Sequence, residues 1–327
     1  MAAATHTHTA LPERAASASV HRFAEAVGSN GSVRVVGART QWNIGRRADE
    51  IETAVREVRA PDGVADVQSS ELIVRVGAGT PVADLVVALA EDGLQCPLDP
   101  LSASASPTVG GVLSVGRSGV RRLRHGHIRD TVLEALYVSA DGILRRAGAP
   151  LVKNVTGFDL PRLFVGSIGT LGLLAEVVLR CGPLPQRRGW WCSTGVDPWK
   201  VRQALFRPSS ILWDGAYTFV QLEGSEAEVS AEFRALPDAA WEECEPPVLP
   251  EVRSLLDPVH LRRLRTEEPS VVFGVVASSW IAELGTGLVH GVSLPAAPMA
   301  PAVLDLNRKV KDAFDPTGRL NPGVLPW

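Results

Sequence analysis

The sequence lacks the features that mark several common classes of protein. Its 327 residues include 33 basic and 36 acidic side chains, and the net charge of −3 offers no basic surface for nucleic acid. The one local basic cluster, residues 121–124 (RRLR), is expected to be a solvated loop. The four cysteines are widely separated, which predicts reduced thiols and no iron–sulfur or zinc site. Because no apolar run approaches the roughly 18 residues of a bilayer span, we expect membrane contact only through a partner.

The first twenty residues are rich in Ala, Thr, Ser and His but lack the apolar core of a signal peptide. We expect residues 1–12 to be disordered and the protein to be cytoplasmic. Two histidines in such a start do not predict a metal site, and we expect none in this chain. The remaining length, with 45% hydrophobic residues overall, is enough for two domains.

Two glycine-rich loops stand out between residues 106 and 180. The first reads Pro107-Thr108-Val109-Gly110-Gly111-Val112, and the second reads Gly166-Ser167-Ile168-Gly169-Thr170-Leu171-Gly172 before an apolar run. Glycines let main-chain N–H groups approach a bulky ligand such as a pyrophosphate. Either loop alone is more often a tight turn, but both in this order indicate a dinucleotide. A Rossmann fingerprint fits less well, because Gly77-Ala78-Gly79 is followed by Val82 where the third glycine belongs.

Six short segments carry a family resemblance. Four of them are Gly77-Ala78-Gly79-Thr80, Pro97-Leu98-Asp99-Pro100, Thr108-Val109-Gly110-Gly111 and Gly126-His127-Ile128-Arg129-Asp130. Together they resemble the flavin-binding domain of the vanillyl-alcohol oxidase / p-cresol methylhydroxylase family. Residues 153–160 (KNVTGFDL) and 314–323 (FDPTGRLNPG) are similar to its glycolate oxidase and D-lactate dehydrogenase branch. The resemblance implies an α+β fold, with a two-subdomain flavin-binding domain and a small α+β cap domain.

The resemblance also implies a bound FAD and the residues around it. It places Gly37, Arg39 and Thr40 in the first pyrophosphate loop, although Arg39 is equally a surface side chain. The other implied contacts with the cofactor are Pro100, Thr108, Gly110, Gly111, Ser114, Gly126, Lys153, Gly169, Thr170, Gly172, Val177 and Asn321. Lys153 is also compatible with a surface role, and Asn321 with a turn. Residues 36–42 contain no His or Cys, so we expect the FAD to be non-covalent.

Hydrophobic periodicity predicts the scaffold of this domain. It indicates helices over 13–27 and from a Thr80 cap to Gly93, and strands over 33–36 and 72–76, with one face of the second strand buried. Residues 132–138 and 143–146 form a hairpin across Asp141-Gly142. Residues 96–116 show no regular pattern, so a bound FAD is the expected partner of their backbone groups. Asp159 is expected to cap a short helix.

The chain changes character near the Gly182-Pro183-Leu184-Pro185 segment. We expect an FAD-binding domain over 13–182, a cap domain over 183–300, and a C-terminal helix and tail over 301–327 that return to the FAD domain. Six of the eight tryptophans lie in the cap, where they are expected to form core. The cap is expected to contain strands over 217–222 and 270–277 and a helix over 226–236, and a final helix is expected over 303–314.

One motif of the catalytic relatives is missing. Members that oxidise 2-hydroxy acids carry a His-x-Gly-Asp-Gly-Asn motif, whereas the second half of this chain has only His260 and His290, each expected to be structural. The catalytic residues are therefore unknown. The absence and the short chain favour an FAD-binding, E-type subunit of glycolate oxidase. Its implied partners are a catalytic D-type flavoprotein subunit, an iron–sulfur F-type subunit at the cytoplasmic membrane face, and a small 2-hydroxy acid. Two alternatives stay open: a self-sufficient FAD-dependent 2-hydroxy-acid oxidase or dehydrogenase, and a flavin-free assembly scaffold.

Overall fold

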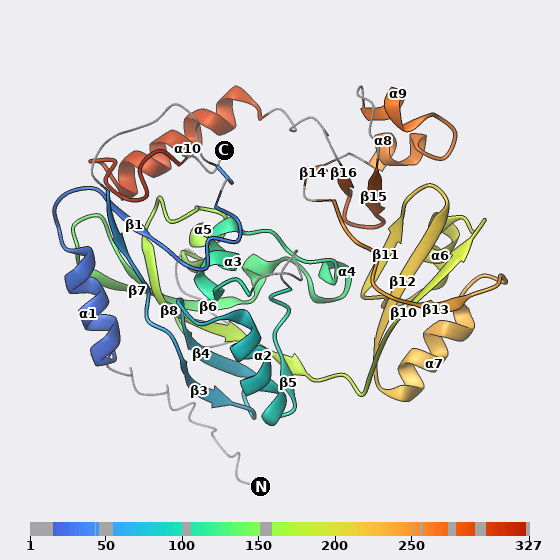
Figure 1. Ribbon diagram of the computed structural model, residues 1–327, viewed down its shortest axis with the longest axis horizontal. Helices are drawn as coiled ribbons and strands as arrows, with labels where there is room; N and C mark the ends of the chain where they lie inside the picture. The colour runs from blue at the N-terminus through green and yellow to red at the C-terminus, as the bar shows by residue number, and fades with distance from the viewer. Residues whose placement is uncertain are drawn as a thin grey trace, which may run out of the picture.

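Two antiparallel sheets are the framework of the chain (Figure 1). The computed structural model describes residues 16–42, 44–45, 55–99, 106–150, 159–250, 252–255, 258–273, 279–291 and 299–324. The first sheet has the order β3-β4-β8-β6-β7, from β3 (Val64–Gln68), β4 (Ile73–Gly77), β6 (Val132–Val138), β7 (Leu144–Gly148) and β8 (Leu173–Arg180). The second has the order β13-β10-β12-β11-β15-β16-β14, from β10 (Arg187–Thr194), β11 (Ser210–Trp213), β12 (Tyr217–Gly224), β13 (Glu242–Cys244), β14 (Val252–Leu255), β15 (Trp280–Glu283) and β16 (Leu288–Gly291).

Short strand pairs and helices surround the two sheets. The pairs are β1 (Val33–Val35) with β2 (Arg56–Val58), which are parallel, and β5 (Leu94–Gln95) with β9 (Gly182–Pro183). The first sheet carries α1 (Ala18–Val27), α2 (Val82–Glu91), α3 (Val109–Val115), α4 (Arg122–His125), the 3₁₀ turn η1 (Ile128–Asp130), α5 (Pro161–Phe164) and α10 (Pro301–Phe314). The second carries α6 (Pro198–Ala204), α7 (Glu226–Ala235), α8 (Pro258–Arg263) and α9 (Pro269–Phe273). The described chain is therefore a mixed α+β fold, as predicted.

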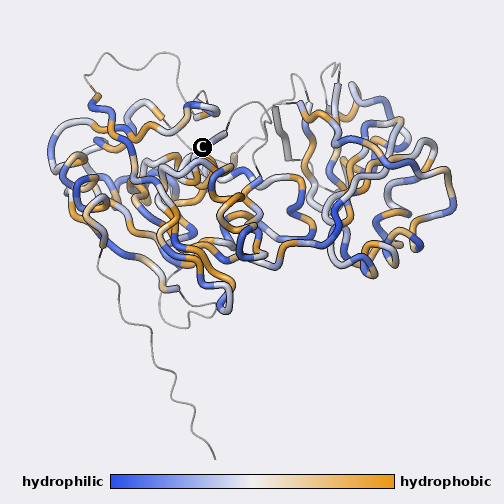
Figure 2. Tube along the Cα trace, turned by 60° about the horizontal axis from the view of Figure 1, so that its bottom comes forward, coloured by the Kyte–Doolittle hydropathy of each residue, from blue (hydrophilic) through white to orange (hydrophobic). Residues whose placement is uncertain are grey.

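Each sheet has its own hydrophobic core, and apolar segments run along the strands of both (Figure 2). In β8, at the centre of the first sheet, seven of eight side chains are buried, which explains the apolar run in the sequence. The predicted hairpin is formed by β6 and β7, and Asp141 Oδ1 accepts the Ile143 N–H at 3.1 Å in its turn. In the second core, Trp191, Trp213 and Trp280 are buried, in agreement with the prediction for the tryptophans. The domain boundaries expected from the sequence stay a prediction.

Local capping explains where the observed elements differ from the expected ones. α1 begins at Ala18 because Ser17 is its N-cap, later than predicted, and residues 13–15 lie outside the described chain. Thr80 does not cap α2, since it is buried and donates to the Gly63 carbonyl at 3.3 Å, and Pro81 stands at the N-cap. β4 begins at Ile73, and both of its faces are mostly buried. Leu72 precedes it with φ +55° and an exposed side chain.

Three further expectations were wrong for related reasons. The segment after residue 106 is not irregular, because the Thr108 side chain accepts the Gly111 N–H at 3.2 Å and starts α3. Asp159 does not cap α5; its carboxylate pairs with Arg162 at 2.7 Å. The strand expected over 270–277 is wrong at its start, where α9 extends to Phe273. We call the part of the chain built around the second sheet the second body. There, α7 opens with a capping box between Ser225 and Glu228.

The C-terminal segment is fixed to β1 by one buried carboxylate and one buried guanidinium. Asp315 accepts hydrogen bonds from the backbone N–H groups of Leu320 at 2.8 Å and Arg319 at 3.1 Å, and from the Lys311 ammonium. Arg319 donates in turn to the carbonyls of Val27, Asn30, Gly31 and Ala140. The backbone of the same segment pairs with β1. The Arg319 carbonyl accepts the Val33 N–H at 2.9 Å, and Leu320 forms a bridge with Val33. The C-terminal segment therefore becomes part of the first body, the part of the chain built around the first sheet (Figure 1).

A buried carboxylate joins the two bodies. Glu223 of β12 is only 1% exposed and binds Arg121 at 3.2 Å and Arg188 at 2.7 Å, together with Arg124 and His125 of α4. We call these five residues the Glu223 cluster. Arg121 is buried and also binds Asp99, so the expectation of a solvated loop over 121–124 was wrong. Among the described helices, none is long and apolar enough to cross a membrane.

Asp315→Asn should destabilise the protein. The amide removes the charge that Lys311 and two backbone N–H groups bind, and a hydrogen bond to a charged group contributes about 1.5–3 kcal/mol. We expect the free energy of unfolding in urea to fall by about 2–3 kcal/mol. Asp312→Asn, on the exposed face of α10 just before Asp315, is the matched control and should change the free energy of unfolding little. Equal effects of the two variants would contradict the role assigned to Asp315.

The contribution of Asp315 should also depend on pH. Burial disfavours its charged form, but the hydrogen bonds from Lys311 and from the Leu320 and Arg319 N–H groups outweigh burial, so its pKa lies below the ordinary 3.8. A carboxyl whose pKa is lowered on folding stabilises fully above its unfolded pKa and loses that effect as the pH falls through its folded pKa. The stability difference between wild type and Asp315→Asn should therefore be constant from pH 7 to about 5 and shrink below about pH 4. A difference that grows on acidification would contradict this assignment.

Candidate functional site

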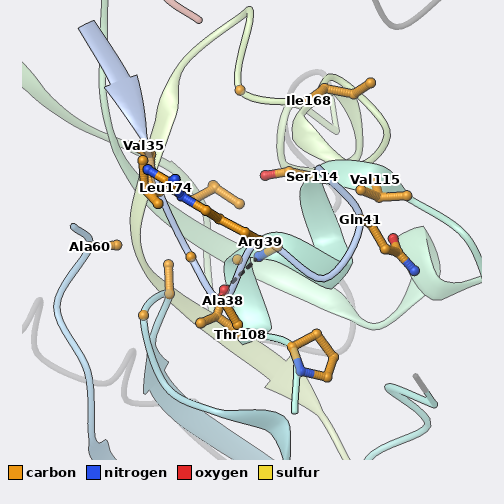
Figure 3. A pocket seen from close by; sticks show the side chains of 18 of the residues that line it. Val35, Ala38, Arg39, Gln41, Ala60, Thr108, Ser114, Val115, Ile168 and Leu174 are labelled. Atoms are coloured by element: carbon orange, nitrogen blue, oxygen red, sulfur yellow. Dashed lines mark hydrogen bonds between the residues drawn. The ribbon is translucent and has the colours of Figure 1, made fainter. Parts of the chain in front are cut away.

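A cavity of about 450 Å³ lies where the first body meets its C-terminal segment. Its walls come from β1 and the loop after it, the loop before β3, the start of α3, the turn before β8, and Asn321 with Val324. Figure 3 shows Arg39, Ser114 and Ile168 around this space, each from a different segment. Six stretches far apart in the sequence, including Ala78 and Gly79, thus meet at one site.

Most of the residues expected around FAD line this cavity. They are Gly37, Arg39, Thr40, Thr108, Gly110, Gly111, Ser114, Gly169 and Asn321. Pro100 and Lys153 lie outside the described residues. The sequence signals were the two glycine-rich loops and the C-terminal Asn-Pro-Gly, and the structure brings residues from all three together.

The loop after β1 offers unpaired backbone donors. Within the described chain, the N–H groups of residues 37–41 have no hydrogen-bond partner, although the loop borders the cavity. Arg39 adopts φ +58°, and its guanidinium binds Glu57 at 2.7 Å and lies 4.7 Å from the ring centre of Trp42. Unpaired N–H groups in successive residues are suited to phosphate oxygens. The charge of Arg39, in contrast, is already paired.

Two glycines allow the walls of the cavity to approach one another. A Cβ on Gly37 would lie 2.5 Å from Thr108 Oγ1. Gly110 donates its N–H to the Ala78 carbonyl at 2.7 Å, and a Cβ there would lie 2.8 Å from the same oxygen. Side chains at these positions would force the loop after β1, α3 and the segment after β4 apart. The glycines therefore keep main chain, rather than side chains, at the cavity wall.

Asn321 presents an unsatisfied acceptor at the same place. Its Nδ2 donates to the Ile168 carbonyl, and its backbone N–H donates to the Val33 carbonyl at 2.8 Å. Its Oδ1 is buried and has no hydrogen-bond partner within the described chain. A buried acceptor without a partner costs about 1–3 kcal/mol, so a ligand group that donates to it would be stabilised. Together with the loop donors and the close glycines, this acceptor fits a dinucleotide such as FAD.

The ionisable groups among the described residues of the cavity are three arginines and one carboxylate. Among the described residues that line it, the ionisable side chains are Arg34, Arg39, Arg59 and Asp62, with no histidine, lysine, cysteine or tyrosine. Elsewhere in the described chain, no three His, Cys, Asp or Glu side chains gather as metal ligands would. The cavity can bind and orient a cofactor, and Asp62 is the one carboxylate among the described residues that line it.

Four expected contacts do not line the cavity. Thr170 is buried and donates to the Ser167 carbonyl at 2.7 Å, so its hydroxyl is already used. Gly172 packs against Tyr137, where a Cβ would lie 2.7 Å from the ring. Val177 is fully buried in the core beneath the sheet. Gly126 ends α4 with φ +81° and is exposed there.

Sequence reasoning missed one wall of the cavity. Ala60 and Asp62 come from the loop between β2 and β3, which carries no glycine-rich motif. A signal was present in Gly79, where a Cβ would lie 2.2 Å from the Ala60 carbonyl. The Gly77-Ala78-Gly79 segment supplied none of the expected FAD contacts, but Ala78 and Gly79 line the cavity themselves. Trp42 also lines it and had no sequence signal.

Comparisons with known proteins agree with this site. Residues 15–148 match the FAD binding domain family. The chain is 32% identical over 183 residues to glycolate oxidase subunit GlcE of Escherichia coli (strain K12), covering 54% of this chain and 52% of that protein. It is 37% identical over 125 residues to glycolate oxidase subunit GlcD of Bacillus subtilis (strain 168), covering 38% of this chain and 26% of that protein. The matches thus span about half of the first relative and about a quarter of the second.

A solved structure shares the fold of this chain. Alkyldihydroxyacetonephosphate synthase superimposes with a TM-score of 0.68 at 15% sequence identity, over 93% of this chain and 74% of the synthase. At that identity the likeness concerns the fold alone. The match of residues 15–148 lies in the body that holds the cavity, and it confirms the resemblance to an FAD-binding flavoprotein. Residues 15–148 are thus similar to the FAD binding domain family, which supports FAD as the cofactor.

Proposed function

We propose that this chain is the FAD-binding subunit of an oxidoreductase of the glycolate oxidase type. The observation that carries the proposal is the similarity to GlcE together with a cavity of unpaired main-chain donors and the unsatisfied Asn321 acceptor. The substrate would be a small 2-hydroxy acid such as glycolate, whose oxidation to glyoxylate releases two electrons and two protons. FAD, when bound, supplies the acceptor for those two electrons.

The lack of a histidine in the described lining favours a subunit over a self-sufficient oxidase. Oxidation of a 2-hydroxy acid needs a group that accepts the hydroxyl proton. His290, one of the two histidines of the second half, is buried and bound to Glu283, away from the cavity lining. The side chain of the other, His260, lies outside the described residues. We therefore propose that a D-type flavoprotein subunit supplies the catalytic groups and that electrons pass to an iron–sulfur F-type subunit.

The remaining parts of the proposal concern arrangement in the cell. Residues 13–182 with 301–327 would form the FAD-binding unit, and residues 183–300 the cap. Contact with the cytoplasmic face of a membrane would be made by the partners, and the FAD would be held without a covalent bond. The support for the last point is that residues 36–42 offer no histidine or cysteine for attachment.

The visible spectrum of the purified chain, before and after anaerobic glycolate, tests the proposal. We expect bands of bound flavin that glycolate does not bleach, because the described lining of the cavity holds no histidine to act as the base. Addition of a D-type subunit should then allow bleaching. Bleaching by glycolate or D-lactate without a partner would show a self-sufficient oxidase or dehydrogenase instead. A colourless chain that takes up no added FAD would show a flavin-free scaffold.

Gly37→Ala should weaken FAD binding without unfolding the protein. The new Cβ would lie 2.5 Å from Thr108 Oγ1 and would push the loop after β1 away from α3. We expect the Kd for FAD, from quenching of flavin fluorescence, to rise at least tenfold, which corresponds to about 1.4 kcal/mol. The control is Gly182→Ala, because a Cβ at Gly182 has no atom within 4 Å. Unchanged FAD affinity in Gly37→Ala would remove this loop from the cofactor site.

A further inference from the structure

A second cavity, of about 610 Å³, lies between the two bodies. The first body contributes Arg124, His125 and Arg180 to its lining, and the second contributes Arg207, Glu223 and Glu228. No described residue lines both this cavity and the FAD cavity. The interdomain cavity is therefore a separate site, and the function proposed above makes no use of it.

The negative charge at its wall is already neutralised. The Glu223 carboxylate binds Arg121 at 3.2 Å and Arg188 at 2.7 Å, has Arg124 at 3.6 Å, and contacts His125. Burial opposes its ionisation, but His125 and the arginines outweigh burial and hold the pKa of Glu223 well below its usual range. One carboxylate is thus shared by three guanidinium groups and an imidazole, and it cannot balance further cations.

The second acid is committed to a helix end. Glu228 accepts the Ser225 N–H at 2.7 Å in the capping box of α7, and its side chain is exposed. Hydrogen bonds from Ser225 lower its pKa, so it stays ionised without an arginine in contact. It reduces the positive charge of the cavity but occupies the rim beside α7.

Two guanidinium groups of the lining make no hydrogen bond or ion pair within the described chain, although the charge of Arg207 acts on Glu228. Arg180, at the end of β8, is half-buried, and its side chain makes no hydrogen bond or ion pair within the described chain. The backbone of Arg207 donates its N–H to Glu232 at 2.8 Å and accepts a hydrogen bond from Arg124 at 2.9 Å. Its exposed side chain makes no hydrogen bond or ion pair with any described residue. The two charges come from different bodies and line the same space.

We propose that the interdomain cavity binds a small oxyanion, a carboxylate or a phosphate, through the side chains of Arg180 and Arg207. Guanidinium groups present paired N–H donors that match the oxygens of either anion. The polar walls and the volume suit a small anion with its hydration water rather than an apolar ligand. Because the two arginines come from different bodies, the bound anion would also strengthen the docking of one body on the other.

Thermal unfolding of the full chain, saturated with FAD, tests this proposal. Added FAD fills the first cavity, so phosphate cannot act there. Inorganic phosphate or malonate is titrated at constant ionic strength against chloride. We expect the Tm to rise and saturate with at least one of the two anions, because a ligand that binds only the folded state stabilises it. A response to phosphate alone or to malonate alone identifies which anion the site takes, and no saturable response to either would overturn the proposal.

Arginine variants locate the response. The double variant Arg180→Gln/Arg207→Gln should weaken the apparent anion affinity at least tenfold, whereas Arg308→Gln, on exposed α10, should leave it unchanged. If the double variant does not fold, Arg207→Gln alone is used, since its exposed side chain has no partner to lose, and a weakening of about threefold is expected. Unchanged affinity in the variant that folds would overturn the proposal. The flavin spectrum, read in the same samples, separates this outcome from a failure to bind FAD.

Discussion

The carboxylate of Asp315 holds together the segment on which the candidate cofactor cavity depends. Its hydrogen bonds to Lys311, Arg319 and Leu320 set the turn after α10, and that turn places Arg319 against the carbonyls at the end of α1 and Asn321 beside Ile168. Without the turn, β1 would lose its bridge to Leu320 and the cavity would lose one wall. A charge buried with several donors is costly to disturb, because each donor would otherwise be left unsatisfied.

The cavity is shaped by two glycines that place no side chain at its walls. Gly37 and Gly110 carry no side chain where Thr108 and Ala78 approach, so main-chain groups face the space that a cofactor would fill. Affinity for a pyrophosphate can then arise from oriented N–H groups rather than from cationic side chains. This arrangement is consistent with Arg39, whose guanidinium is paired with Glu57 although it borders the site.

Local signals in the sequence were sufficient for much of this structure, and long-range ones were not. The Asp141-Gly142 hairpin, the buried run of β8 and the glycine-rich loops could be predicted, because each depends on residues close together in the chain. The burial of Arg121 could not, since its partner Glu223 lies 102 residues away. Thr80 and Asp159 are of residue types common at helix N-caps, but they bind other partners in the folded chain. The Ala60 wall of the cavity depends in the same way on a contact with Gly79.

The position of Asn321 has a consequence for the order of events during synthesis. A ribosome that has completed β8 has already made every wall of the FAD cavity except the one from Asn321 and Val324, and it must add the whole second body before that last wall exists. The pairing of Val33 with Leu320 closes a loop of nearly the full chain, and contacts of such separation form late in folding. Nascent chains would therefore expose an open, incomplete nucleotide site while the second body is being made, and loading of the cofactor would be a post-translational step.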